Sequence, residues 1–274
     1  MSEQKAIQDV DSPRTRATLA ADLRALGLEP GMTVLVHSSL SAIGYVVGAA
    51  VDVVQALMDV VTPEGTLVMP THTSENSEPS YWRHPPVPEA WWPIIRDTMP
   101  AFEPAITPTR QMGRIVETFR TWPGVRRSNH PALSFAAWGR HAAFVTADHA
   151  LEYSLGDQSP LARVYDLDGW VLLLGVGHAN NTSLHLGEYR AGTSGDELQG
   201  AALLEDGRRV WKSYHDTAWN DDPFPEIGAA FDATGQTRIG KIGSAESRLF
   251  RQRAAVDFAQ QWLAARAAAP SAIP

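Results

Sequence analysis

Thr33-Val34-Leu35-Val36-His37 and Thr66-Leu67-Val68-Met69 are two short apolar runs of the kind that forms buried strands. Residues 49–61, between them, have the spacing of an amphipathic helix. The side chains that we expect on its inward face are Val51, Val54, Leu57, Met58 and Val61. Thr62-Pro63-Glu64-Gly65 then predicts a turn. A strand, a helix and a second strand in this order predict a parallel or mixed sheet with helices packed on it.

The rest of the chain extends this sheet. Residues 170–176, Trp-Val-Leu-Leu-Leu-Gly-Val, are the most apolar run and predict a central strand, and residues 133–138 predict another. Asp206-Gly207 predicts a hairpin turn between residues 201–204 and 208–213. Further helices are predicted over residues 13–26 (with Ser12 as N-cap), 114–122, 142–147, 160–165, 181–190 and 245–267.

These elements predict one α/β domain over residues 1–274, with a central mixed sheet flanked by helices. Residues 71–110 are rich in proline and aromatic side chains and lack periodicity, so we expect a long functional loop there. The tail, residues 268–274, is expected to be frayed.

The composition excludes several kinds of chemistry. The 274 residues include no cysteine, which rules out disulfides, thiolate catalysis and cysteine zinc sites. The net charge of −8 argues against a nucleic-acid partner and suits either a cationic ligand or plain solubility. Residues 1–16 contain no signal-peptide pattern and no run is apolar enough for a membrane span, so we expect a cytoplasmic protein.

Polar residues follow two of the predicted strands. His37-Ser38-Ser39 ends the first strand, and residues 177–185 follow the most apolar one. Ligands of open α/β sheets bind at the carboxyl ends of strands, so both segments are candidate walls of a site. The helix that begins near Asn181 would present free N–H groups there, which suit an anion or a carbonyl oxygen that gains charge.

Thr182, His185 and Glu188 are spaced three residues apart and should share one face of that helix. A carboxylate one turn from a histidine can orient the ring of a general base. A structural histidine paired with an acid fits the same spacing. A metal site could be drawn from His37, His178 and His185, but no H-E-x-x-H run supports it, and we expect no metal.

Other catalytic patterns are weak. Ser38 and Ser39 lack a G-x-S-x-G elbow, and no dinucleotide or Walker loop is present. Carboxylates mixed with tryptophan and tyrosine gather in the loop after Pro70 and in the segment after Tyr214. Such mixtures suit sugar or amine recognition, although each residue alone fits solvated surface equally well.

Four motifs in register resemble the aminoglycoside 3-N-acetyltransferase family. They are Val36-His37-Ser38-Ser39-Leu40-Ser41-Ala42-Ile43-Gly44, Gly65-Thr66-Leu67-Val68-Met69-Pro70-Thr71, Arg127-Ser128-Asn129-His130-Pro131, and Leu173-Leu174-Gly175-Val176-Gly177-His178 running into Asn181-Thr182-Ser183-Leu184-His185-Leu186-Gly187-Glu188. The resemblance extends from about Leu23 to the C-terminal helix. It implies the family's own α/β fold, acetyl-coenzyme A as cosubstrate, and a polycationic aminoglycoside acetylated on its 3-amino group, a reaction that confers antibiotic resistance.

The resemblance also suggests roles for individual residues. His185 matches the catalytic histidine, and we expect Glu188 to orient it and Thr182 to help stabilise the oxyanion. The segments that look like the family's cofactor site contain His37, Ser38, Ser39, Leu40, Thr71, Asn129, His130 and Val176. The carboxylates expected to face the acceptor are Glu75, Glu78, Asp216, Asp221 and Asp222. Because cysteine is absent, we expect direct transfer in a ternary complex.

Two other functions remain open from the sequence. Some family members act on other amines, so the acceptor could be a different amine metabolite. A carbohydrate-binding protein or glycosidase would also use aromatic side chains and paired carboxylates. The sequence does not predict the oligomeric state.

Overall fold

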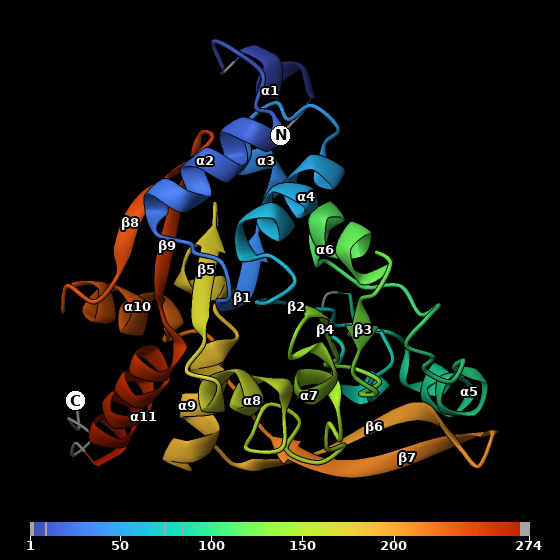
Figure 1. Ribbon diagram of the computed structural model, residues 1–274. Coiled ribbons are helices and arrows are strands. Elements are labelled where there is room, and N and C mark those ends of the chain that lie inside the picture. Colours follow the sequence, from blue (N-terminus) through green and yellow to red (C-terminus); the bar gives the residue numbers. More distant parts are fainter. Residues whose placement is uncertain (1–2, 9, 74, 84, 269–274) are drawn as a thin grey trace.

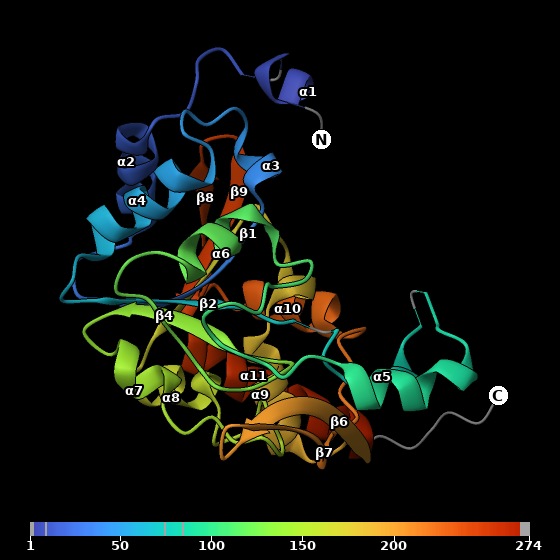
Figure 2. The same ribbon diagram turned by 90° about the vertical axis from the view of Figure 1, so that its right-hand side faces the viewer.

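The computed structural model describes residues 3–8, 10–73, 75–83 and 85–268 (Figures 1 and 2). The helices are α1 (Glu3–Gln8), α2 (Arg16–Leu26), α3 (Leu40–Ile43), α4 (Ala50–Val61), α5 (Trp92–Thr98), α6 (Gly113–Arg120), α7 (Ala142–Thr146), α8 (Pro160–Asp166), α9 (Ser183–Ala191), α10 (Phe224–Asp232) and α11 (Gln252–Ala268), with short 3-10 helices η1 (Pro79–Tyr81), η2 (Glu89–Trp91) and η3 (His178–Asn180). The strands are β1 (Thr33–Ser38), β2 (Thr66–Pro70), β3 (Arg126–Arg127), β4 (Phe135–Gly139), β5 (Trp170–Leu174), β6 (Asp196–Glu205), β7 (Arg208–Thr217), β8 (Arg238–Ile242) and β9 (Ala245–Arg251).

Seven strands form one mixed sheet in the order β3-β4-β2-β1-β5-β9-β8. The strands β2, β1 and β5 are parallel neighbours, and the outer pairings are antiparallel. The predicted mixed sheet is therefore confirmed. The register pairs His37 with Leu173 and Ser38 with Leu174, so the carboxyl ends of β1 and β5 lie at the same edge of the sheet.

Helices cover both faces of this sheet (Figures 1 and 2). Val34 and Val36 of β1 pack with α2, α4 and α6 on one face. Leu35 points to the other face, where it packs with side chains from α7, α8, α9 and α11. A strand that is buried on both faces needs apolar residues at consecutive positions, which explains the unbroken apolar runs of β1, β2 and β5.

The C-terminal part departs from the sequence prediction. Residues 245–251 were expected to begin a long helix, but they form strand β9, and the helix begins at Gln252. Ala245, Ser247 and Leu249 are buried at alternate positions, which is the period of a strand. Helix α10 and strand β8 were not predicted. The predicted frayed tail lies, apart from Ala268, outside the described residues.

Two predictions within the N-terminal helices are also wrong. The N-cap of α2 is Thr15 and not Ser12, because Thr15 and Thr18 form a reciprocal capping box. The helix ends at Leu26, as predicted, and Gly27 caps it in the left-handed conformation. In α4, Val54, Leu57 and Val61 are buried as predicted, but Val51 is 42% exposed, and Val53 and Val60 are buried in addition.

The hairpin β6–β7 is a separate two-stranded sheet that runs beside residues 71–110 (Figure 1). Its turn has positive φ at Asp206 and Gly207, as the Asp-Gly pair predicted. The Asn76 side chain accepts from the Ala202 N–H (2.7 Å) and donates to the Ala202 carbonyl (2.6 Å). Residues 71–110, predicted to be irregular, contain α5 and two short 3-10 helices. No helix among the described residues is long and apolar enough to cross a membrane.

Candidate active site

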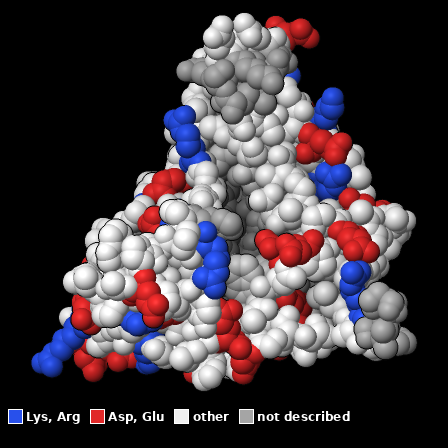
Figure 3. All heavy atoms as spheres, turned by 180° about the vertical axis from the view of Figure 1, so that it is seen from behind, with Lys and Arg blue, Asp and Glu red and all other residues white. Residues whose placement is uncertain are grey.

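A cleft of about 220 Å³ opens where the carboxyl ends of the parallel strands meet. Figure 3 shows this face of the molecule hollowed near its centre, with acidic side chains along one border. The residues that line the cleft are His37, Ser38, Pro70, His72, Gln111, Met112, Val116, Leu133, Leu155, Val176, Ala179, Asn180, Asn181, Thr182, His185, Trp219, Asp221 and Phe224. The two polar segments that the sequence placed at strand ends therefore share one cleft.

His185 and Glu188 lie on α9 and form the predicted pair. His185 Nδ1 is 2.9 Å from Glu188 Oε2, and both side chains are buried. Because an ionised carboxylate only accepts hydrogen bonds, the pair holds the proton on Nδ1. The remaining nitrogen, Nε2, is then an acceptor, which is the state that a general base needs.

Aromatic rings and a hydroxyl surround this histidine. The Trp219 ring meets the His185 ring edge to face at 5.1 Å, and the Phe224 ring lies 4.6 Å away at a tilt. Trp219 is 44% exposed, so it also offers a free surface to a ligand. Thr182, at the start of α9, lines the same cleft.

Two further histidines in the cleft lining are neutral. Burial lowers the pKa of His37 to about 3. Burial also lowers the pKa of His72 to about 3, and the nearby His37 and His185 rings add to the effect. Within the part of the chain that the structure describes, Nε2 of both rings is buried without a hydrogen-bond partner, as are Ser38 Oγ and Asn181 Nδ2. Unpaired buried polar atoms are rare in proteins, and four around one cleft suggest groups that a ligand or water satisfies.

A second depression adjoins the cleft. It is lined by Ser38–Ser41 and by residues 111–115, and it shares Ser38, Gln111 and Met112 with the cleft. The residues expected to bind a cofactor divide accordingly. His37, Ser38 and Val176 line the cleft, whereas Ser39 and Leu40 line the depression.

The other three expected cofactor residues lie outside both cavities. His130 is buried and accepts from the N–H groups of Ala132 and Leu133, while Asn129 is exposed. Thr71 is fully buried and accepts hydrogen bonds from Arg127 through its carbonyl (2.7 Å) and its hydroxyl (3.1 Å).

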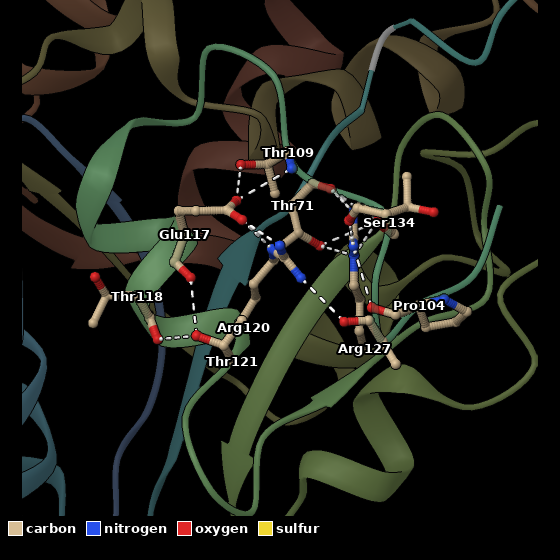
Figure 4. Close-up of polar contacts among 11 residues, drawn as sticks. Thr71, Pro104, Thr109, Glu117, Thr118, Arg120, Thr121, Arg127 and Ser134 are labelled. Carbon is tan, nitrogen blue, oxygen red and sulfur yellow. Dashed lines mark hydrogen bonds and ion pairs between the residues drawn. The ribbon is translucent and has the colours of Figure 1, made fainter. Parts of the chain in front are cut away.

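Arg127 is the centre of one of the two groups of polar contacts in Figure 4. Its guanidinium also donates to Ser134 Oγ and to the carbonyls of Thr107 (2.5 Å) and Pro104 (3.3 Å), and it lies over the Phe102 ring. Burial lowers the pKa of Arg127 to about 10. Through these contacts Arg127 joins Pro104 and Thr107, near the end of the 71–110 loop, to the ends of β2 and β4. Thr71 is therefore part of the network that holds this loop in place.

Of the five carboxylates expected at the acceptor site, Asp221 lines the cleft. Glu78 is paired with Arg96 (2.6 Å), and Glu75 with Arg110 (3.4 Å). Asp222 lines a different depression, beyond Glu188. Asp216 is 2% exposed and accepts from Ser154 and Tyr189.

Some residues of the site were missed from the sequence. His72 and Phe224 line the cleft, and Ser194 contacts Glu188. His72 lies three residues after Met69, the last residue of a predicted strand, so the rule that drew attention to His37 could have found it. Ser194 and Phe224 lie in segments whose path the sequence left open.

Among the described residues, no group of three or more histidine, aspartate and glutamate side chains could hold a metal ion. His178, one of the histidines considered for such a site, contacts Asp232 (3.1 Å) and stacks on Phe250.

A family model described as aminoglycoside 3-N-acetyltransferase matches residues 35–264. The chain belongs to this family. The family is one of acyltransferases, and the sequence resemblance is confirmed. A relative in Bacillus subtilis (strain 168), the SPbeta prophage-derived aminoglycoside N(3')-acetyltransferase-like protein YokD, is 51% identical over 94% of this chain and 95% of its own. The crystal structure of YokD superimposes with a TM-score of 0.93.

Solved structures of relatives with bound ligands include the following two. AAC-IIIb, described as binary with CoASH, is 32% identical over 95% of this chain and all of its own, with a TM-score of 0.84. AAC-VIa bound to sisomicin is 31% identical over 94% of this chain and all of its own, also with a TM-score of 0.84. These likenesses confirm the predicted fold.

Proposed function

We propose that this protein transfers the acetyl group of acetyl-coenzyme A to the 3-amino group of an aminoglycoside, with His185 as the general base. The observation that carries the proposal is the buried His185–Glu188 pair at the wall of a cleft. Support comes from the family and from relatives that bind CoASH and sisomicin. Such an activity would confer antibiotic resistance and would operate in the cytoplasm.

The acceptor nitrogen must lose two protons, one before it attacks the thioester and one as the amide forms. A protonated amine has no lone pair, so it cannot attack the thioester until a base accepts its proton. His185 Nε2 takes that proton, and the Glu188 carboxylate stabilises the resulting imidazolium. The amine nitrogen then bonds to the acetyl carbon, and the carbon–sulfur bond breaks. The thiolate leaves and takes the proton of the imidazolium, and the second proton of the nitrogen passes to the neutral His185 or to water, so that the amide and the thiol form with one proton released.

Two groups would support the intermediate. The thioester oxygen gains charge in the tetrahedral intermediate, and the Thr182 hydroxyl or backbone N–H groups near Gly177 would stabilise it. The chain has no cysteine to carry an acyl group, so transfer is direct within a ternary complex. Acetyl-coenzyme A would extend along the depression at Ser39 and Leu40, while the acceptor faces Asp221 and Trp219.

A different amine is the second candidate acceptor. Of the five expected carboxylates only Asp221 lines the cleft, which favours an acceptor with fewer positive charges than an aminoglycoside. A panel of aminoglycosides and simpler amines, each with acetyl-coenzyme A, distinguishes the two. Failure of every aminoglycoside in the panel would reject the leading proposal.

The base is tested with His185→Ala. The matched control is His215→Ala, because His215 is exposed on β7. We expect turnover to fall by about 10²–10⁴-fold in the first variant and to be unchanged in the second. Circular dichroism checks the fold of both. Near wild-type turnover in a folded His185→Ala variant would show that another group is the base.

A further inference from the structure

Glu188 uses both of its carboxylate oxygens, and only one faces the catalytic histidine. Oε2 contacts His185 Nδ1. Oε1 accepts a hydrogen bond from Ser194 Oγ (2.8 Å) and another from the backbone N–H of Asn220 (2.8 Å). Glu188 is 3% exposed, so these three groups are its environment in place of water.

Ser194 reaches Glu188 from the connection between α9 and β6. It lines a depression that also contains Glu188, Asp222 and Glu226 and lies apart from the cleft. His185 is on the cleft side of Glu188. Ser194 is thus separated from the reacting atoms by the Glu188 side chain, and any effect on catalysis must pass through the carboxylate.

The two donors on Oε1 fix the plane of the carboxylate. A carboxylate with a single partner can rotate about its terminal torsion, which is broad and soft. Hydrogen bonds to a charged group are stronger than neutral ones, so two of them on one oxygen hold the other oxygen toward His185. The Asn220 N–H belongs to the segment that carries Trp219 and Asp221, so the same carboxylate also joins α9 to one wall of the cleft.

We propose that Ser194 is a positioning residue that orients His185 through Glu188. This inference rests on the proposed function for its kinetic consequence, although the structural linkage exists without it. The Ser194 hydroxyl directs the positive end of its dipole at Oε1. Removal of the hydroxyl leaves the Glu188 carboxylate freer to rotate. It also takes away a positive dipole end, which makes the electrostatic potential at the His185 ring more negative.

The experiment compares Ser194→Ala with Ser194→Thr, which keeps the hydroxyl. Ser213→Ala is the matched control, since Ser213 is exposed on β7. For Ser194→Ala we expect kcat to fall about tenfold, with KM for both substrates within about twofold. The acidic limb of the kcat/KM profile should move to higher pH. Ser194→Thr should recover most of kcat, and Ser213→Ala should match the wild type.

A second readout does not depend on the acceptor. The ring carbon signal of His185, followed by nuclear magnetic resonance against pH, should titrate at higher pH in Ser194→Ala than in the wild type. If no aminoglycoside is turned over, the proposed function fails while this titration still tests Ser194. If the ring of a folded Ser194→Ala variant titrates as in the wild type, the positioning role is wrong. An unmoved pH profile with a lower kcat would likewise reduce Ser194 to a structural residue.

Discussion

Replacing Glu188 by glutamine should reverse the tautomer of His185. The side chain keeps its shape but exchanges one acceptor oxygen for an NH₂ group. Two donors, from Ser194 and the Asn220 backbone, face Oε1, whereas His185 faces Oε2. Turning the NH₂ group toward the two donors would leave buried N–H groups unpaired, at about 1–3 kcal/mol each. The amide oxygen should therefore stay with the two donors, and the NH₂ group should face His185.

The consequence falls on the other nitrogen of the ring. With a donor opposite it, His185 Nδ1 must accept, so the ring proton moves to Nε2. A ring that already carries a proton on Nε2 cannot take one from the acceptor amine there. We expect kcat to fall about 10³-fold, which corresponds to about 4 kcal/mol of lost transition-state stabilisation.

Release of coenzyme A thiol provides the assay. The chain contains no cysteine, so a thiol reagent reports the product without a background signal from the protein. Glu29→Gln, at an exposed site between α2 and β1, is the control. Nitrogen chemical shifts of the His185 ring identify the tautomer directly. A Glu188→Gln variant within about threefold of wild-type kcat, or an inactive one with the proton still on Nδ1, would refute the reasoning.

Three further outcomes are expected. If Asp221 attracts a cationic acceptor, KM for that acceptor should rise from low salt to about 0.5 M salt, and Asp221→Asn should remove this dependence; an unchanged wild-type KM would argue against attraction. Burial lowers the pKa of His37 from 6.5 to about 3, so the neutral ring contributes stability above pH 6.5 that is lost as the pH falls toward 3. His37→Gln should therefore lose less free energy of unfolding between pH 7 and acid than the wild type does, as measured by urea titration at several pH values, and parallel losses would contradict this. Arg127→Met leaves the carbonyls of Thr71 and Thr107 without their donor and should cost about 3 kcal/mol, or roughly 5–10 °C in Tm by calorimetry; an unchanged Tm would show that the network in Figure 4 is dispensable.

The central sheet and the His185–Glu188 pair could be predicted because their signals are local. Buried parallel strands require unbroken apolar runs, and a base with its orienting acid requires only a spacing of three on one helix. Strand β9 was mistaken for helix because it leads directly into α11, and an apolar pattern in a short segment fits both periods.

The acceptor carboxylates could not be chosen in this way. Glu78 and Asp221 are equivalent as sequence, since each is an acid beside tryptophans in an irregular segment. The structure distinguishes them by their partners, because Glu78 forms an ion pair with Arg96 whereas Asp221 lines the cleft. Such partners come from distant parts of the chain, and no pattern within either segment encodes them.

The hairpin β6–β7 and residues 71–110 are far apart along the chain, yet each completes the hydrogen bonds of the other. Asn76 bonds the Ala202 backbone in both directions, Phe102 N–H donates to the Ala202 carbonyl, and the Arg209 guanidinium donates to carbonyls of α5 and of Met99 next to it. If either segment changed its backbone path alone, these polar groups would lose their hydrogen-bond partners. In protein engineering the two should therefore be exchanged as one cassette: a chimera that takes both from a relative should fold, whereas a chimera that takes only one should not.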